Sequence, residues 1–172
     1  MSENSENQAI QYLTFRIGDE LFALDVSQVR EVLDFSSITK VPRAPDFMRG
    51  VINVRGNVVP VVDLRCKFGL EPTEKTLDTR IVVMELSMDD ELTVLGAMAD
   101  SVHEVIELEV GQIEAPPRIG TRWRTEFIKG IGKRDELFII ILDIDRIFST
   151  DELAMVDAGT DNLAAAVADA PA

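Results

Sequence analysis

Two segments of this chain match each other when the sequence is shifted by 80 residues. Residues 47–68 align without a gap on residues 127–148. Four aligned positions are identical, and seven others pair one apolar residue with another. Upstream, residues 29–32 (VREV) match residues 102–105 (VHEV) with an offset of 73. The shared order of strand, turn, strand and helical turn predicts two homologous β units. The identical positions are Phe47/Phe127, Gly50/Gly130, Asp63/Asp143 and Phe68/Phe148.

Apolar residues occur in short runs separated by turn signals, a pattern typical of small antiparallel sheets. Residues 10–17 and 20–26 alternate on either side of Gly18–Asp19, which predicts a hairpin. A turn at Gly56–Asn57 joins two further runs, and Pro60 predicts a sheet edge or bulge because it donates no hydrogen bond. The remaining strands are predicted at 38–42, 51–55, 58–62, 80–86, 92–99, 127–134 and 136–144.

Helices are predicted to be short. Residues 27–34 and 101–107 show apolar positions at helical spacing. A single helical turn is expected between Asp63 as N-cap and Gly69 as stop. A C-terminal helix is predicted to begin near residue 150, where Ser149 and Glu152 have the spacing of a capping box. Residues 71–79 and 114–126 are expected to be loops.

A unit of about five short strands buries an inner face only by closing, since an open antiparallel sheet leaves unpaired edges. The repeat therefore predicts two small barrels. Their facing surfaces would form a groove, which in a protein without catalytic groups indicates binding.

Composition excludes several classes of function. The net charge of -14 opposes nucleic-acid binding, and the longest uncharged run is too short to cross a membrane. With one histidine and one cysteine, metal sites built from these ligands are incomplete, and no nucleotide-binding motif supports a cofactor. The polar N-terminus and unpaired Cys66 favour the cytoplasm.

Catalytic candidates are few. Asp63 and Asp143 occupy equivalent places and suggest a carboxylate pair, but each also follows a strand and precedes a helical turn, so helix capping explains them. His103 has no paired nucleophile, and Cys66 is expected to be a small buried apolar residue.

Basic residues cluster in the matching hairpins. Residues 40–67 carry six bases and two acids, and residues 118–134 carry six bases and one acid. Such clusters in an acidic protein would steer a polar protein partner. The alternative is that they neutralise nearby carboxylates.

Three spaced motifs resemble the CheW family of bacterial chemotaxis coupling proteins. They are Val-x-Glu-Val at 29–32, Pro-x-Phe-x-x-Gly-Val-x-Asn-x-Arg-Gly at 45–56, and Pro-Val-Val-Asp-Leu at 60–64. The resemblance covers residues 10–155 and includes the second repeat. It leaves residues 1–9 as a flexible N-terminus and residues 156–172 as an acidic, alanine-rich tail.

The resemblance implies a mainly β fold of two intertwined five-stranded SH3-like barrels with short helices and a C-terminal helix. It implies a non-enzymatic adaptor, without cofactor or metal, that couples the cytoplasmic tips of methyl-accepting chemoreceptors to the regulatory domain of the histidine kinase CheA. Other copies of the family would be ring neighbours. The protein would be cytoplasmic and recruited to receptor arrays.

The resemblance also implies roles for individual residues. It assigns receptor binding to Val29, Glu31, Gly50, Arg55 and Val105, and kinase binding to Glu114 and Ile119. Each has a structural alternative: the valines as core, Gly50 as a backbone requirement, and Glu31 as a solvated residue. Glu114 stands where the family is usually basic. Trp123, between two arginines, is either an interface anchor or packed under a loop.

Competing functions are a coupling module of a different chemosensory-type system, a small-ligand sensor that uses the groove between the barrels, and a hydrolase that uses Asp63 and Asp143.

Overall fold

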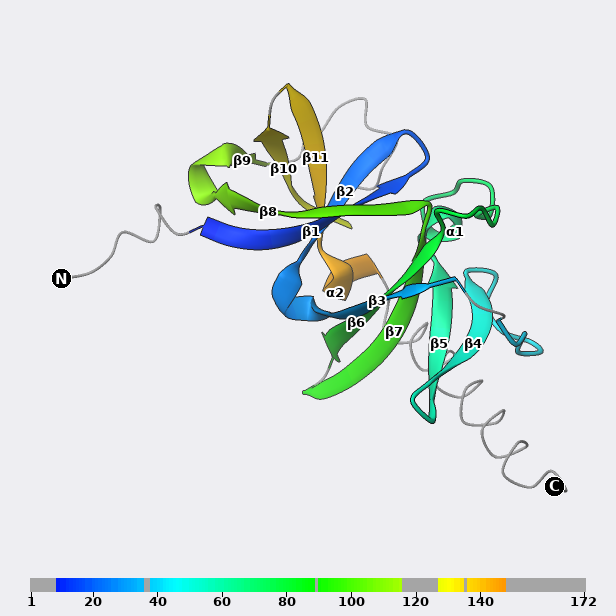
Figure 1. The fold of residues 1–172 in the computed structure, drawn as a ribbon. Helices are drawn as coiled ribbons and strands as arrows, with labels where there is room; N and C mark the ends of the chain where they lie inside the picture. The colour runs from blue at the N-terminus through cyan, green and yellow to red at the C-terminus, as the bar shows by residue number, and fades with distance from the viewer. Residues whose placement is uncertain (1–8, 36–37, 89, 116–126, 135, 148–172) are drawn as a thin grey trace, which may run out of the picture.

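The computed structural model describes residues 9–35, 38–88, 90–115, 127–134 and 136–147. Strands dominate these residues, and the helical segments between them are short (Figure 1). No helix in these ranges is long and apolar enough to span a membrane. The elements are β1 Ala9–Ile17, β2 Glu20–Asp25, η2 Val26–Gln28, β3 Val29–Asp34, β4 Met48–Val54, β5 Asn57–Asp63, α1 Leu64–Lys67, β6 Arg80–Met88, β7 Glu91–Ala99, β8 Ser101–Glu109, η3 Val110–Gln112, β9 Ile113–Glu114, β10 Ile128–Arg134, β11 Leu137–Leu142 and α2 Ile144–Ile147.

The strands form two sheets that are built on one scheme. The six-stranded sheet has the order β8-β1-β2-β11-β10-β9, and the five-stranded sheet has the order β3-β6-β7-β5-β4. In each, one hairpin (β1–β2 or β6–β7) pairs in parallel with the last strand of another hairpin (β10–β11 or β4–β5). The mainly β fold with two SH3-like units is confirmed, and the two-residue strand β9 adds a sixth strand to one of them.

The repeat units and the sheets do not coincide. The first unit gives β1 and β2 to the six-stranded sheet and β3, β4 and β5 to the five-stranded sheet. The second unit does the reverse, with β6 and β7 in the five-stranded sheet and β8, β10 and β11 in the six-stranded sheet. The prediction from the repeat, that each unit closes on itself, is therefore wrong, whereas the intertwined barrels that the resemblance implied are confirmed. The exchange of hairpins is what makes the barrels intertwined.

Burial on both faces of the exchanged hairpins explains this exchange. One face lines the interior of a barrel, where Tyr12 of β1 and Ile81 of β6 are buried. The other face lies in an apolar cluster shared by the two sheets, which we call the seam cluster. Burial on both faces gives near-continuous apolar runs, as in residues 81–84. Fully buried members of the seam cluster include Phe15, Phe22, Leu24, Val62, Leu64, Met84, Leu86 and Leu95.

Two predicted helices are strands. Residues 27–34 form the end of η2 and then β3, and residues 101–107 belong to β8. Both strands lie at sheet edges, where pairing with β6 and β1 outweighs a local pattern that is too short to fix the period. In β3 the half-buried positions alternate as Val29, Glu31 and Leu33, instead of the helical grouping of Val29 with Val32.

The other local predictions vary in outcome. The hairpin turn lies at Arg55–Gly56, one residue before the predicted position, because Val54 pairs with Asn57. Pro60 lies in an inner strand, and the irregularity is in β4 between Met48 and Gly50. Residues 38–42 contribute one isolated bridge, from Thr39 to Val51, in place of a strand. The predicted C-terminal helix lies outside the described residues.

The first short helix has the predicted ends. Asp63 caps α1 with its side chain, which accepts the Arg65 N–H at 3.1 Å, and Gly69 has a positive φ of 76°. Residues 71–79 form a loop, as predicted.

Candidate functional site

Two residues implied to bind the receptor, Glu31 and Arg55, are in direct contact. The guanidinium of Arg55 donates Nη1 to Glu31 Oε2 at 3.0 Å and Nη2 to Glu31 Oε1 at 3.2 Å. This is a bidentate pair, the geometry in which arginine holds a carboxylate with the greatest specificity. The sequence separation is 24 residues, so only the folded chain brings them together.

The pair joins opposite edges of the five-stranded sheet. Glu31 lies on β3 and Arg55 in the turn after β4, and these two strands are the first and last of the sheet. The isolated bridge from Thr39 to Val51 joins the chain after β3 to β4 in the same way. Both contacts help to close this sheet into a barrel.

Beside the pair lies an open hollow of about 500 Å³, which we call the Arg55 hollow. Its charged part consists of Arg30, Glu31 and Arg55, and its apolar part includes Val58, Val83 and Val94. Alternation along β3 turns the Glu31 side chain inward, so it is 22% exposed, whereas that of Arg55 is 78% exposed. The hollow therefore combines apolar side chains with two exposed cations, Arg30 at 53% and Arg55 at 78%.

The other three implied receptor residues lie elsewhere. Val29 begins β3 and packs against the seam cluster, half-buried. Val105 is 51% exposed on β8, in the other sheet. The sequence-based prediction of helices in both segments did not reveal this difference in burial, because it placed both valines in the same kind of environment.

Gly50 is buried and supports the backbone. Its φ is 148°, and a Cβ at this position would lie 2.2 Å from the backbone oxygen of Thr39. A side chain at Gly50 would thus displace the segment that makes the bridge to Val51. The structure supports the alternative that Gly50 meets a backbone requirement.

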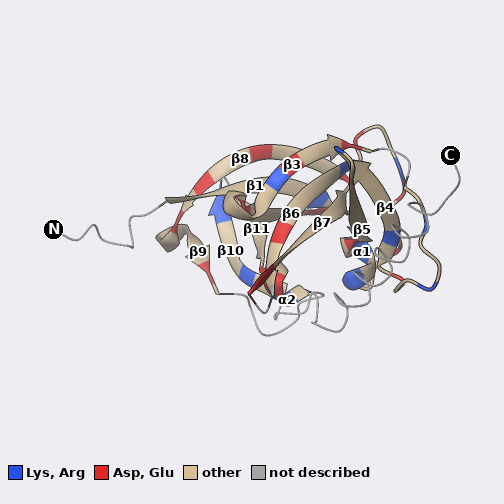
Figure 2. Cartoon of the chain, turned by 90° about the horizontal axis from the view of Figure 1, so that it is seen from below, with Lys and Arg blue, Asp and Glu red and all other residues tan. Residues whose placement is uncertain are grey.

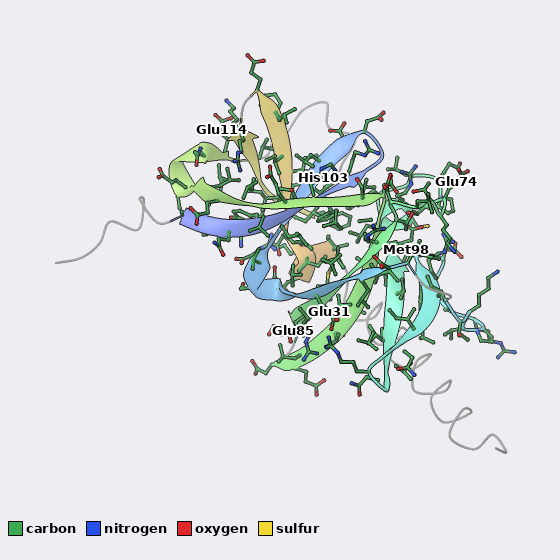
Figure 3. All side chains as sticks on the ribbon, viewed as in Figure 1. Glu31, Glu74, Glu85, Met98, His103 and Glu114 are labelled. Carbon is green, nitrogen blue, oxygen red and sulfur yellow. The ribbon has the colours of Figure 1, made fainter. Side chains whose placement is uncertain are left out.

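Glu114, one of the two implied kinase contacts, has an ion-pair partner in its own chain. Its Oε1 lies 3.0 Å from the Nζ of Lys133 on β10, and both side chains are more than half exposed. Glu114 on β9 and Glu31 on β3 lie on different sheets, in separate parts of the molecule (Figure 3). Ile119 and Trp123 lie outside the described residues.

The basic residues of the first cluster are largely paired. Arg49, Arg55 and Arg65 form ion pairs with Asp63, Glu31 and Asp100. Lys67 lies over two aromatic rings, 5.2 Å from the centroid of Phe47 and 5.7 Å from that of Phe127. These three arginines therefore do neutralise nearby carboxylates, although the side chain of Arg55 stays 78% exposed. Figure 2 shows basic positions on α1, β4 and β10, and acidic positions along β8.

Asp63 is a structural group. Its carboxylate is fully buried and accepts the N–H and the hydroxyl of Thr73, both at 2.8 Å, as well as the Arg65 N–H and Arg49 Nη1, both at 3.1 Å. These four hydrogen bonds leave no lone pair for a substrate. A carboxylate so enclosed does not serve as an accessible general base.

Cys66 and the possible metal ligands are the remaining candidates for reactive chemistry within the described part of the chain. Burial raises the pKa of the Cys66 thiol, with a smaller contribution from the charge of Asp63, which keeps the sulfur protonated and unreactive. Among the described residues no group of three histidine, cysteine, aspartate or glutamate side chains is arranged to hold a metal ion. The arrangement around Arg55 is suited to binding a macromolecule.

Comparisons with known proteins identify the family to which this fold belongs. The family model described as CheW-like domain matches residues 11–152. Chemotaxis protein CheW of Klebsiella aerogenes is 32% identical over 147 residues, which cover 86% of each chain. Protein FrzA of Myxococcus xanthus is 31% identical over 121 residues, covering 70% of this chain and 72% of FrzA.

A solved structure shows the same fold. It is the crystal structure of the scaffolding protein TtCheW from Thermoanaerobacter tengcongensis, with a TM-score of 0.74 and 35% sequence identity. The match covers 88% of this chain and 96% of that one. With the family model spanning most of the sequence and both sheets, the chain belongs to the CheW-like domain family.

Proposed function

We propose that the chain is a non-enzymatic chemotaxis adaptor that couples transmembrane chemoreceptors to the histidine kinase CheA. Family membership supports this role, since its relatives are named as chemotaxis and scaffolding proteins. The adaptor acts in the cytoplasm, at receptor arrays, and uses no cofactor.

The Arg55 hollow carries the proposal for the receptor side. A receptor tip is a helical hairpin, and an apolar helix face fits a hollow with a valine floor. Arg55 stands exposed at the rim and is held there by Glu31, so its position is set before the receptor arrives. Val105 adds exposed apolar surface on β8, while Val29 and Gly50 act by supporting the strands beneath the contact.

For the kinase side we propose the region of Glu114 and Ile119. The regulatory domain of CheA has the same fold, so two such modules meet as pseudo-equivalent partners. A ring of modules needs two different faces on each one, and Glu31 and Glu114 lie on different sheets. The Lys133 partner of Glu114 neutralises the acid that stands at a usually basic position, so the kinase needs no compensating base there.

A charge swap tests the receptor side. Arg55→Glu places two carboxylates opposite each other and removes the more exposed cation, so we expect receptor binding to fall about tenfold. In the double variant Glu31→Arg/Arg55→Glu the pair can form again, but with the acid on the exposed side. We therefore expect the double variant to bind as weakly as Arg55→Glu. The measurement is binding to a soluble cytoplasmic receptor fragment, together with kinase stimulation in a reconstituted mixture.

The matched control is Arg16→Glu, an exposed charge reversal on β1 in the other sheet. It should leave receptor binding unchanged. Full recovery in the double variant would show that the pair stabilises the barrel without presenting Arg55 to the receptor. Unchanged binding in Arg55→Glu would refute the proposed site.

A second candidate is coupling in a different chemosensory-type system, which the match to protein FrzA favours. Pull-downs from cell extract with the parent protein and Arg55→Glu as paired baits separate the two candidates. Recovery of CheA with chemoreceptors supports the first candidate, and recovery of another histidine kinase supports the second.

A further inference from the structure

The turn that carries Arg55 has an unusual backbone. Because Val54 pairs with Asn57, Arg55 and Gly56 form a two-residue hairpin turn, with φ values of 53° and 87°. Two positive φ values are the requirement of a type I′ turn, for which asparagine or glycine is favoured in the first position. A residue with a long side chain seldom occupies this conformation. A local hydrogen bond that fixes this turn would therefore favour Arg55 in the left-handed conformation.

Asn53 provides that hydrogen bond. Its side-chain Oδ1 accepts the N–H of Gly56 at 2.7 Å, which ties the last part of β4 to the second residue of the turn. Asparagine is suited to such local bonds because its short side chain can reach the backbone of residues that follow it.

The position of Arg55 determines its contact with Glu31. Both oxygens of Glu31 are engaged by the fork of Arg55, across the two edges of the five-stranded sheet. A bidentate pair of this kind tolerates little displacement of the guanidinium. A turn that relaxed to negative φ would point the Arg55 side chain in another direction and lose one or both bonds.

The equivalent hairpin has no asparagine at the position of Asn53, so the fold itself does not require this side-chain hydrogen bond. With the 80-residue offset, Lys133 stands in the place of Asn53 and carries no acceptor atom. The β10–β11 hairpin nevertheless closes by pairing Arg134 with Leu137, and Glu136 beside Leu137 has a φ of 68°. Asn53 thus supplies an acceptor beside the exposed arginine, whereas Lys133 at the equivalent position cannot supply one.

We infer that Asn53 is a positioning residue of the receptor-coupling site, whose amide oxygen holds Arg55 in the left-handed conformation needed for its bidentate pair with Glu31. This inference rests on the proposed function. Asn53 acts through Arg55, so its removal should weaken receptor binding only as far as Arg55 loses its place.

The test compares Asn53→Ala, which removes the acceptor, with Asn53→Asp, which keeps an oxygen in the same place. In solution, NMR reports the positive φ of Arg55 through its strong intraresidue amide–α-proton NOE, and hydrogen exchange reports the Gly56 amide. Asn57→Ala removes an amide from the same hairpin and serves as the control for these two readouts. We expect the NOE to weaken and Gly56 exchange to rise about tenfold only in Asn53→Ala.

Binding to the soluble receptor fragment supplies the functional readout. We expect Asn53→Ala to bind about fivefold more weakly and Asn53→Asp to stay within about twofold of the parent protein. In the Asn53→Ala background, adding Arg55→Ala should weaken binding less than it does in the parent, because part of the contribution of Arg55 is already lost.

The outcomes separate this inference from the proposed function. If Arg55→Glu weakens binding but Asn53→Ala changes neither Gly56 exchange nor affinity, the positioning role is refuted and the coupling site stands. If Asn53→Ala changes the turn while every Arg55 variant binds like the parent, the proposed function fails. Equal losses in Asn53→Ala and Asn53→Asp would refute the role of the acceptor oxygen.

Discussion

The β4–β5 and β10–β11 hairpins end in equivalent aspartates whose surroundings differ. In both, the backbone N–H donates to a phenylalanine carbonyl, from Asp63 to Phe47 at 2.7 Å and from Asp143 to Phe127 at 2.9 Å. The Asp63 carboxylate is fully buried and accepts two hydrogen bonds from Thr73. The side chain of Asp143 is 28% exposed, and its Oδ2 lies 3.5 Å from the Nε of Arg146. The fold thus needs this backbone contact twice, but uses the buried carboxylate once.

The two hairpins also differ in the side chains that their tips expose. The first presents a charged side chain, Arg55, with a defined partner. The second presents apolar surface, since Leu137 is 60% and Phe138 is 63% exposed. Two copies of one hairpin therefore share their core contacts and differ where they face a partner, which is the expected pattern when burial restrains the core and leaves the surface free to change.

The largest effect should distinguish the two aspartates. Asp63→Ala leaves Arg49 and Thr73 without their acceptor, so we expect a loss of about 4 kcal/mol in the free energy of unfolding. Asp143→Ala removes a partly exposed group and should cost less than about 1 kcal/mol. Urea unfolding followed by circular dichroism measures both. Equal losses would show that the carboxylates have the same role despite their different burial.

A second comparison concerns the equivalent glycines of β4 and β10. Gly50→Ala places a Cβ against the backbone oxygen of Thr39 at a φ of 148°, so about 3 kcal/mol should be lost. Gly130→Ala has no positive φ to strain, and its Cβ meets the Cγ2 of Ile113 at 2.5 Å but a backbone oxygen, that of Glu114, only at 3.1 Å. We expect about 1.5 kcal/mol there. Thermal unfolding of both variants tests the difference, and a larger loss for Gly130→Ala would contradict it.

The smallest expected effect tests how far the backbone symmetry extends. Thr14 on β1 is buried and donates its hydroxyl to the carbonyl of Glu104 at 2.6 Å, while its counterpart in β6 is Val83. Thr14→Val should cost about 1 kcal/mol, the value of one hydrogen bond. Val83→Thr should cost no more, provided that the new hydroxyl reaches the carbonyl of Glu31.

A crystal structure of Val83→Thr checks the second part directly. A hydroxyl bonded to the Glu31 carbonyl would show that the two irregular edge contacts share one backbone geometry. A buried hydroxyl without an acceptor, with a loss well above that of Thr14→Val in urea unfolding, would show that the symmetry ends at the strand order.

Local signals predicted much of the strand structure. The Gly18–Asp19 turn, the capping Asp63 and the stop at Gly69 depend on the conformations of a few neighbouring residues, and all three are present. The prediction of helices around the VREV and VHEV segments was wrong because such short segments fit a period of 3.6 as well as a period of 2. Pairing with β6 and β1 decides between them, and those partners lie tens of residues away in the sequence.

The candidate site was predicted from the resemblance as a set of residues, without their arrangement. The motifs identified Glu31 and Arg55 but did not predict the contact between them. The segment of β3 was predicted as a helix, so the inward direction of the Glu31 side chain was not recognised. Asn53 lies within the motif at residues 45–56, yet its role depends on a turn that begins one residue earlier than predicted.

By itself, the sequence determined the number of repeats, their strand-rich character and the turns between strands, because turn chemistry and apolar alternation act over a few residues. Only the tertiary structure decided which hairpin joins which sheet. A hairpin such as β1–β2 can bury its apolar faces in either barrel, and the choice depends on the shared seam cluster, in which residues from both repeats are buried together. The ion pair between Glu31 and Arg55 follows from that choice, since it needs both edges of one closed sheet.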